Sequence, residues 1–188
     1  MKTYLILVKH SLPEIVEGMP AREWKLSPTG RIRAQELAER LSEFQPQMIV
    51  SSSEPKAKET AEIVAGRYNL QLQIADGLHE HGRSKTPYRF RDEFQSAIRE
   101  FFEKPDVLVF GSETANESHA RFYQAIYLII NSNRNKTIVA VAHGTVISLF
   151  VSRLIRISGF VLWKELGLPS FVIIDMESNR LITRENIN

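Results

Sequence analysis

Short apolar runs, each followed by polar residues, recur along the chain. One run covers residues 3–8, a second covers residues 48–50 and a third covers residues 137–142. A continuous apolar run of this length is typical of a strand that is buried on both faces, as in parallel sheets. Residues 70–74 alternate between apolar and polar side chains. This alternation predicts a strand nearer the edge of the sheet.

Apolar residues at helical spacing separate these predicted strands. Ser27 followed by Pro28 predicts a helix start, because serine caps a free backbone N–H and proline suits the first helical position. Pro46 should end that helix. Residues 54–55 open a second helix, and residues 114–117 form a capping box ahead of a third. The predicted apolar face of this third helix comprises Tyr123, Ile126, Tyr127 and Ile130.

The last third of the chain continues the same pattern. We expect a helix over residues 145–157, after the third apolar run and a turn at residues 143–144. Residues 171–175 and 180–184, which are separated by a polar turn, predict a closing hairpin. Strands that alternate with helices over long connections indicate an α/β fold, a three-layer α/β/α sandwich with a mostly parallel central sheet.

The middle of the chain departs from this alternation. We interpret residues 82–111 as a cap-like helical excursion from a single domain that spans residues 1–188. One helix is expected over residues 91–103, with an apolar stripe of Phe94, Ala97, Ile98, Phe101 and Phe102. The phenylalanines could line a substrate pocket, but their helical spacing favours packing of the excursion against the core.

Composition narrows the possible functions. The chain has 188 residues, a formal net charge of +2 and no basic block, which gives little support for nucleic-acid binding. It contains no cysteine, so disulfides, cysteine-bound metals and a thiol nucleophile are excluded. No secretory signal or membrane-spanning run is visible, and we expect a cytoplasmic protein without a membrane partner.

Polar, chemically active residues follow three of the predicted strands. Residues 9–11 read Lys-His-Ser, residues 51–53 are three serines followed by Lys56, and residues 143–144 read His-Gly ahead of a helix. Ligands in open α/β sheets bind beyond the carboxyl ends of the strands, and helix N-termini favour anions. Together these segments outline a site for phosphate or another oxyanion.

Each of these segments also has a purely structural interpretation. A single histidine after a strand is often a hydrogen-bonded structural residue, a helical lysine is often solvated, and a run of serines often forms a turn. The shared position of all three segments is what favours an anion-binding enzyme.

Five segments in order resemble the motifs of the histidine phosphatase superfamily, which has the phosphoglycerate mutase-like fold. Residues 7–11 are similar to its strand with R-H-G, residues 24–34 to W-x-L-T/S-x-x-G-x-x-Q-A, residues 52–61 to S-S-P-L-x-R-A-x-Q-T-A, residues 78–80 to its L-x-E segment, and residues 141–144 to its second histidine motif.

The resemblance implies roles for individual residues. His10 would attack phosphorus and form a phosphohistidine, His143 would contact the phosphoryl oxygens, and Glu80 would protonate the leaving oxygen and then activate water. The backbones of Gly144 and Thr145 would add donors at a helix start. The resemblance implies no metal and no cofactor.

Three positions depart from the family pattern. Lys9 and Lys56 stand where the family has arginine, and lysine lacks the planar fork that grips two phosphate oxygens. Ser11 replaces the glycine of R-H-G, and Arg83 is either a compensating guanidinium or a surface arginine. The predicted phosphate-binding set is therefore Lys9, Ser11, Lys56, Arg83, Gly144 and Thr145.

Residues 79–81, which read His-Glu-His, raise the question of a metal site. They lack the H-E-x-x-H spacing, and alternate residues of an extended segment point in opposite directions. We therefore expect no metal.

The sequence predicts a metal-independent phosphomonoesterase that acts through phosphohistidine on a phosphorylated small molecule or phosphoprotein. The loss of both arginines leaves open a catalytically weak phosphate-binding or regulatory module. A cofactor-dependent phosphoglycerate mutase is less favoured, because 188 residues leave little room for that group's insertion and tail. The substrate and the oligomeric state are not identified.

Overall fold

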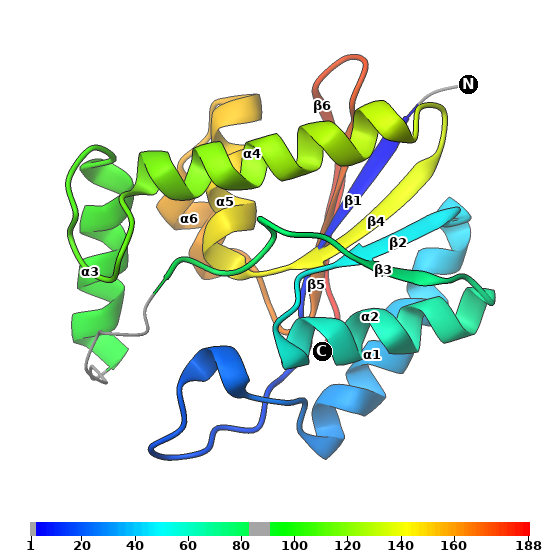
Figure 1. The fold of residues 1–188 in the computed structure, drawn as a ribbon, viewed down its shortest axis with the longest axis horizontal. Helices are drawn as coiled ribbons and strands as arrows, with labels where there is room; N and C mark the ends of the chain where they lie inside the picture. Colours follow the sequence, from blue (N-terminus) through cyan, green and yellow to red (C-terminus); the bar gives the residue numbers. More distant parts are fainter. Residues whose placement is uncertain (1–2, 83–90) are drawn as a thin grey trace.

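The computed structural model describes residues 3–82 and 91–188 (Figure 1). The strands are β1 (Tyr4–Lys9), β2 (Met48–Ser51), β3 (Leu72–Ile74), β4 (Thr137–Ala142), β5 (Ser170–Asp175) and β6 (Arg180–Asn186). The α-helices are α1 (Pro28–Arg40), α2 (Pro55–Tyr68), α3 (Arg91–Glu103), α4 (Ala115–Ser132), α5 (Gly144–Ile155) and α6 (Gly159–Glu165). Short 3-10 helices cover Ala21–Glu23 and Leu41–Phe44.

Within the described residues the strands form one mostly parallel sheet. Their order is β3-β2-β4-β1-β5-β6. The pairs β2–β3, β2–β4 and β1–β4 are parallel, and β5 is antiparallel to β1 and to β6. The predicted mostly parallel sheet and the closing hairpin are confirmed. β3 lies at one edge, as its alternating sequence predicts.

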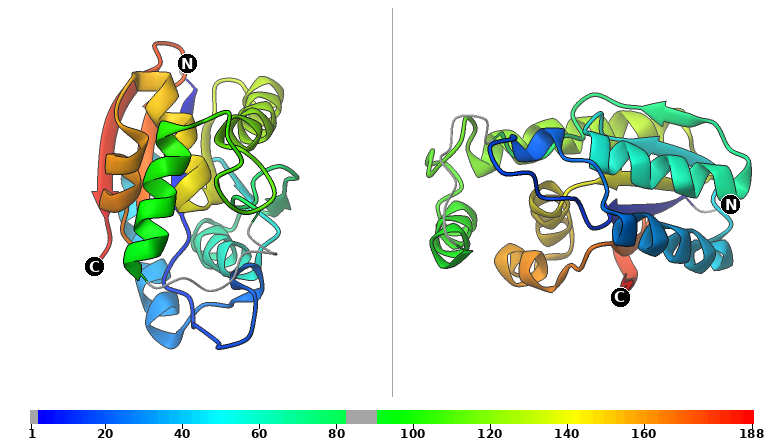
Figure 2. Two further views of the ribbon diagram at one scale, coloured as in Figure 1. Left: turned by 90° about the vertical axis from the view of Figure 1, so that its left-hand side faces the viewer. Right: turned by 90° about the horizontal axis from the view of Figure 1, so that it is seen from below.

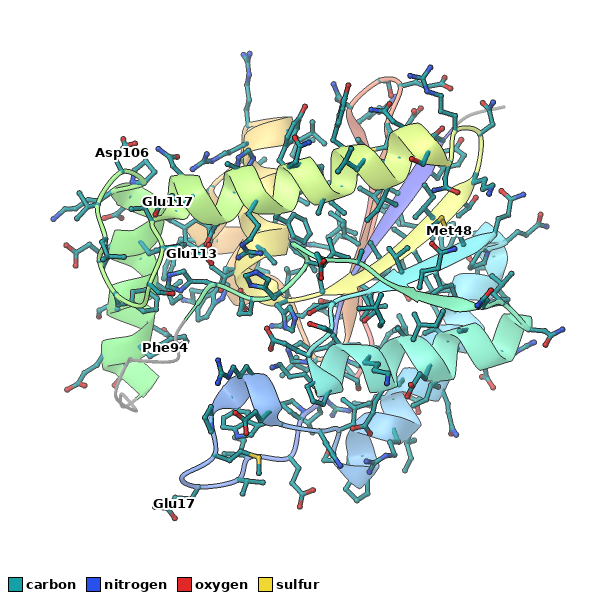
Figure 3. The ribbon with its side chains drawn as sticks, viewed as in Figure 1. Glu17, Met48, Phe94, Asp106, Glu113 and Glu117 are labelled. Carbon is teal, nitrogen blue, oxygen red and sulfur yellow. The ribbon has the colours of Figure 1, made fainter. Side chains whose placement is uncertain are left out.

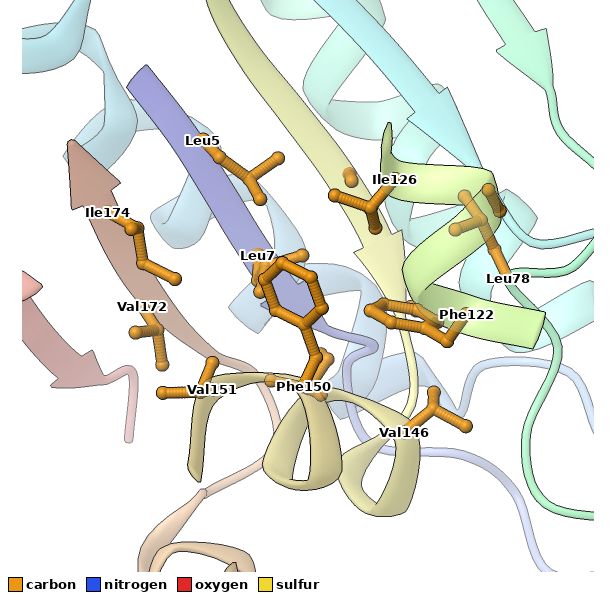
Figure 4. Close-up of a cluster of buried hydrophobic side chains, with 14 of the residues drawn as sticks. Leu5, Leu7, Leu78, Phe122, Ile126, Val146, Phe150, Val151, Val172 and Ile174 are labelled. Atoms are coloured by element: carbon orange, nitrogen blue, oxygen red, sulfur yellow. The ribbon is translucent and has the colours of Figure 1, made fainter. Parts of the chain in front are cut away.

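Helices cover both faces of the sheet. α1 and α2 lie on one face and α4 and α5 on the other, which gives the predicted three layers (Figures 1 and 2). On the second face, Phe122 of α4 and Phe150 of α5 meet with ring centroids 5.8 Å apart (Figure 4). None of the helices within the described residues is long and apolar enough to cross a membrane.

Two of the three predicted helix starts have capping hydrogen bonds. The Ser27 hydroxyl accepts the Gly30 N–H at the start of α1, with Pro28 at the first helical position. At α4 the Thr114 hydroxyl accepts the Glu117 N–H, and the Glu117 carboxylate accepts the Thr114 N–H. The capping box predicted from residues 114–117 is confirmed.

The apolar stripe of α3 packs against α5 and α6. Phe101 is fully buried there, in a cluster with Leu149 of α5 and Phe160 of α6. This confirms that the stripe predicted for the middle segment serves packing. That residues 82–111 act as a cap on a single domain stays a prediction.

The predicted face of α4 is partly wrong. Ile126 is buried, but Tyr123 and Tyr127 are 45% and 51% exposed. Phe122, one residue before Tyr123, points into the core instead. Adjacent helical residues differ by about 100° around the helix axis. The predicted apolar face, which includes Tyr123 instead of Phe122, is therefore rotated towards solvent. The sequence interpretation also missed α6, which has 7 residues.

We expect Phe122→Ala to lower the free energy of unfolding by about 3–5 kcal/mol, because it removes a fully buried ring and leaves a cavity. Tyr127→Ala on the same helix should cost less than about 1 kcal/mol, because that ring is half exposed. Urea denaturation of both variants measures the difference. Equal losses would contradict the observed orientation of α4.

Candidate active site

The carboxyl ends of three neighbouring strands form the edge where the predicted site residues meet. β1, β4 and β2 are adjacent and parallel, so they end side by side. The pairing continues past the strands, because the His10 N–H donates to the Ala142 carbonyl at 3.0 Å. Likewise, the Ser52 N–H donates to the Val141 carbonyl at 3.0 Å. The backbones of His10 and Ser52 are therefore hydrogen-bonded to β4. His143 directly follows Ala142, the last residue of β4.

His10 has a defined tautomer. Its Nδ1 lies 2.8 Å from the Ser11 carbonyl oxygen, which can only accept a hydrogen bond. Nδ1 must therefore carry the hydrogen, and in the neutral ring the lone pair is on Nε2. The residue is 8% exposed. A buried imidazole with its Nε2 lone pair available is suited to nucleophilic attack.

The surroundings of His10 favour its neutral form. Burial, followed by the neighbouring His143 and Lys56, holds the pKa of His10 well below its usual value of 6.5. Lys9 lowers the pKa further, and the bond to the Ser11 carbonyl acts in the opposite direction. The ring is therefore uncharged at neutral pH.

His143 lies beside His10 at the start of α5. It is the N-cap residue of that helix and is fully buried. The two imidazole centroids are 5.2 Å apart. The His143 Nε2 lies 2.9 Å from the Ser52 hydroxyl, which follows β2. The two histidines predicted from separate motifs thus share one site.

Both lysines reach the same edge, and backbone carbonyls hold them there. Lys56 is 5% exposed, and its Nζ donates to the Ala21 carbonyl at 2.7 Å. The Lys9 Nζ donates to the Leu166 carbonyl at 2.7 Å. The Lys9 stem packs on Gly144, where a Cβ would lie 3.2 Å from the Lys9 Cε. The alternative of a solvated lysine at position 56 is wrong.

Glu80 contacts the start of α5. Its Oε2 accepts the Thr145 N–H at 3.2 Å, and its Oε1 accepts the His81 N–H at 2.9 Å. The first turn of a helix offers unpaired N–H groups and favours anions. Glu80 therefore meets the backbone group that is predicted to bind phosphate.

Two predicted phosphate ligands fall outside this group. Ser11 is fully buried, its hydroxyl donates to the Gly30 carbonyl, and its N–H donates to the Thr60 hydroxyl. Both donors are engaged within the fold, so we leave Ser11 out of the proposed ligands. Arg83 lies outside the described residues.

Glu54 is the site residue that the sequence interpretation missed. Its Oε2 lies 2.5 Å from the Lys56 Nζ, and its Oε1 lies 3.5 Å from the His143 Nε2. The same Oε1 accepts the Glu80 N–H at 2.9 Å. In the sequence, Glu54 serves as a helix-start signal before Pro55 and lies within the motif over residues 52–61. Neither feature indicates these contacts.

The segment that carries Glu80 is held by Arg121 of α4. The Arg121 Nη1 donates to the carbonyls of Gly77 at 2.7 Å and His79 at 2.9 Å. Its Nη2 pairs with Glu113 at 2.6 Å, and Glu113 also accepts the Gly82 N–H. Glu113 lies just before α4, below the helix in the view of Figure 3. Arg121 and its ion pair with Glu113 together therefore fix the backbone on both sides of Glu80.

The His-Glu-His segment does not bring its two histidines together. His79 is exposed, whereas His81 is 2% exposed and packs against Phe101 and Phe110. Among residues 3–82 and 91–188, no group of three or more His, Asp or Glu residues is arranged to hold a metal ion.

Comparison with known families assigns this chain. The family model for the histidine phosphatase superfamily (branch 1) matches residues 5–186. The chain belongs to this superfamily, as its motifs predict, and it is a phosphatase of the histidine phosphatase type. No curated protein matches it.

Solved structures share the fold at low sequence identity. A phosphoserine phosphatase from Entamoeba histolytica, in complex with 3-phosphoglyceric acid, has a TM-score of 0.79 at 22% identity and covers 98% of this chain and 97% of its own. A mycobacterial glucosyl-3-phosphoglycerate phosphatase has a TM-score of 0.75 at 22% identity and covers 90% of this chain and 88% of its own. A putative alpha-ribazole-5'-P phosphatase from Escherichia coli has a TM-score of 0.74 at 20% identity and covers 100% of this chain and 97% of its own.

We expect Arg121→Lys to lower kcat by about tenfold to a hundredfold while KM changes less than about twofold, because lysine keeps the charge but cannot hold several carbonyls in one plane. Steady-state kinetics measures this split, and thermal unfolding checks the fold. Arg134→Lys, an exposed arginine just beyond α4, is the control. A change in KM alone would contradict a role in positioning Glu80.

The lowered pKa of His10 makes stability depend on pH. The unfolded chain binds a proton at His10 near pH 6.5 and the folded chain does not, so the free energy of unfolding falls as pH falls below about 6.5. This contribution reaches about 1.4 kcal/mol per pH unit. His10→Asn should make the dependence shallower between about pH 5 and 6.5, as urea titrations would show. Identical slopes would contradict it.

Proposed function

We propose that this chain is a metal-independent phosphomonoesterase that transfers the phosphoryl group to His10 and then to water. The tautomer of His10 carries this proposal: the Ser11 carbonyl fixes the hydrogen on Nδ1, and so directs the Nε2 lone pair to phosphorus. Lys56 and the start of α5 supply positive charge around the position of the phosphoryl group, and the His143 imidazole beside His10 contacts the phosphoryl oxygens.

In the first step, the His10 Nε2 lone pair forms a bond to phosphorus as the bond from phosphorus to the ester oxygen breaks. The leaving oxygen takes a proton from the Glu80 carboxyl group, which is thereby ionised. In the structure the Thr145 N–H donates a hydrogen bond to the Glu80 carboxyl group. When Glu80 turns to the leaving group, this N–H becomes available to a phosphoryl oxygen.

In the second step, water attacks phosphorus and the bond from phosphorus to Nε2 breaks. The Glu80 carboxylate takes one proton from that water, which restores the carboxyl group, and inorganic phosphate leaves. His10 returns to its neutral form with the Nδ1 hydrogen still bonded to Ser11. No oxidant, reductant or metal enters either step.

A phosphorylated small molecule or phosphoprotein is the proposed substrate class. The similar structures include phosphatases named for phosphoserine and for glucosyl-3-phosphoglycerate, which supports a phosphomonoester of modest size. A phosphate-binding module without turnover is less well supported, because both histidines and Glu80 meet at one edge. The cytoplasmic location expected from the sequence stays a prediction.

We expect His10→Asn to lower kcat for p-nitrophenyl phosphate by at least about a thousandfold, because asparagine can still donate to the Ser11 carbonyl but offers no nucleophilic nitrogen. The wild-type protein, quenched during turnover with labelled substrate, should carry acid-labile phosphate, and the variant should carry none. Turnover should persist in EDTA.

His119→Asn is the matched control, because His119 lies on α4 and is another histidine whose pKa is lowered, to about 4, chiefly by burial. It should retain wild-type kcat. Undiminished turnover by His10→Asn would remove the phosphohistidine mechanism. Phosphate binding without turnover of any of a broad panel of phosphomonoesters by the wild-type protein would favour the binding module.

A further inference from the structure

Glu54 has a position at a helix start but not the role of a cap. It is the N-cap residue of α2, yet its side chain makes no capping hydrogen bond. The carboxylate turns instead to the catalytic edge, where the side chain is 11% exposed. A carboxylate that is almost buried needs compensating charge and hydrogen bonds.

The compensation for Glu54 comes from groups of the active site. The Lys56 Nζ lies 2.5 Å from its Oε2, and the His143 Nε2 lies 3.5 Å from its Oε1. The Glu80 N–H donates to the same Oε1 at 2.9 Å. Lys56 and His143 are two of the groups that the proposed function assigns to the phosphoryl oxygens.

A carboxylate and a phosphate compete for the same kind of partner. Both offer anionic oxygens to ammonium, imidazole and backbone N–H donors. With Lys56 engaged by Glu54, an incoming phosphate either takes over the Lys56 Nζ or binds next to an ion pair whose positive charge is already balanced. Glu80, whose backbone N–H contacts Glu54, brings a second carboxyl group to the same edge.

We propose that Glu54 is an internal anion that competes with phosphate for Lys56 and His143, and that it thereby determines the affinity of the site for phosphate. This inference rests on the proposed phosphate site, and it adds a residue that acts on affinity and not on the chemical step. When the phosphoryl group binds, the Glu54 carboxylate gives up its contact with Lys56. When inorganic phosphate leaves, Glu54 returns to it.

The competition has a consequence for turnover. Inorganic phosphate, the product, is an anion much like the phosphomonoester and would also bind tightly to an uncompensated cluster of cations. Glu54 offers these cations an alternative partner inside the protein. The residue thus weakens product inhibition, at the cost of weaker substrate binding.

The test uses the full chain and inorganic phosphate as the probe. Glu54→Gln removes the charge and keeps an oxygen that can accept the Glu80 N–H. We expect this variant to bind phosphate at least about tenfold more tightly by calorimetry, with a matching fall in the inhibition constant for phosphate. The reason is that the variant removes the negative charge of Glu54, which repels a phosphate bound within a few ångströms of it.

Glu62→Gln is the matched control. Glu62 lies on the same helix, its side chain is 51% exposed, and it pairs with Lys58 at 3.6 Å. Its replacement removes the same charge from α2 outside the site, and phosphate affinity should stay within about twofold of wild type, because exposed charges are screened. Unchanged or weaker phosphate binding by a folded Glu54→Gln would overturn the proposal.

A second measurement does not depend on the folding of that variant. In a crystal structure of the wild-type protein with phosphate, the Glu54 Oε2 should no longer lie within 4.0 Å of the Lys56 Nζ, the limit for an ion pair. Phosphate bound to Lys56 and His143 with the 2.5 Å contact retained would overturn the proposal. Both results concern binding, so they stand apart from loss or retention of turnover in His10→Asn, which tests the chemical mechanism.

Discussion

The parallel pairing of β1 with β4 and of β4 with β2 is the constraint on which the active site depends. Because these strands end together, residues that are 133 positions apart in sequence, His10 and His143, have ring centroids 5.2 Å apart. The backbone bond from His10 to the Ala142 carbonyl extends this pairing by one residue beyond the strands. Neither histidine can shift along its strand without breaking ladder hydrogen bonds, so the sheet sets the geometry of the chemistry.

The second constraint is the placement of positive charge at this edge. Carbonyl oxygens from two distant segments, at Ala21 and Leu166, orient the Lys56 and Lys9 side chains. These contacts require the segments before α1 and before β5 to lie at the site. Burial is the largest cause that keeps the His10 ring neutral, and the neighbouring His143, Lys56 and Lys9 act in the same direction. The nucleophile and the anion-binding charge thus depend on each other.

Much of the architecture could be predicted from the sequence, because local signals and burial agree. Fully apolar strands, the Ser27-Pro28 start and the box at Thr114 each act within a few residues. The face of α4 could not be predicted as well, because Phe122 and Tyr123 are both aromatic and both contact Phe150. Burial in the rest of the core distinguishes Phe122 from Tyr123. The 7-residue helix α6 is too short to show a helical period.

The active site likewise contains residues that could be predicted from the sequence and residues that could not. Residues next to strand ends could be predicted from topology, whereas Glu54 and Arg121 depend on side-chain direction and tertiary contacts. Glu54 also bears on the exchange of arginine for lysine at position 56. An ammonium group has three N–H donors, and Ala21 and Glu54 engage two of them. A phosphate that displaces Glu54 can accept the N–H that Glu54 accepted and also the third N–H. Lys56 can therefore bind two phosphate oxygens only when the Glu54 carboxylate moves away.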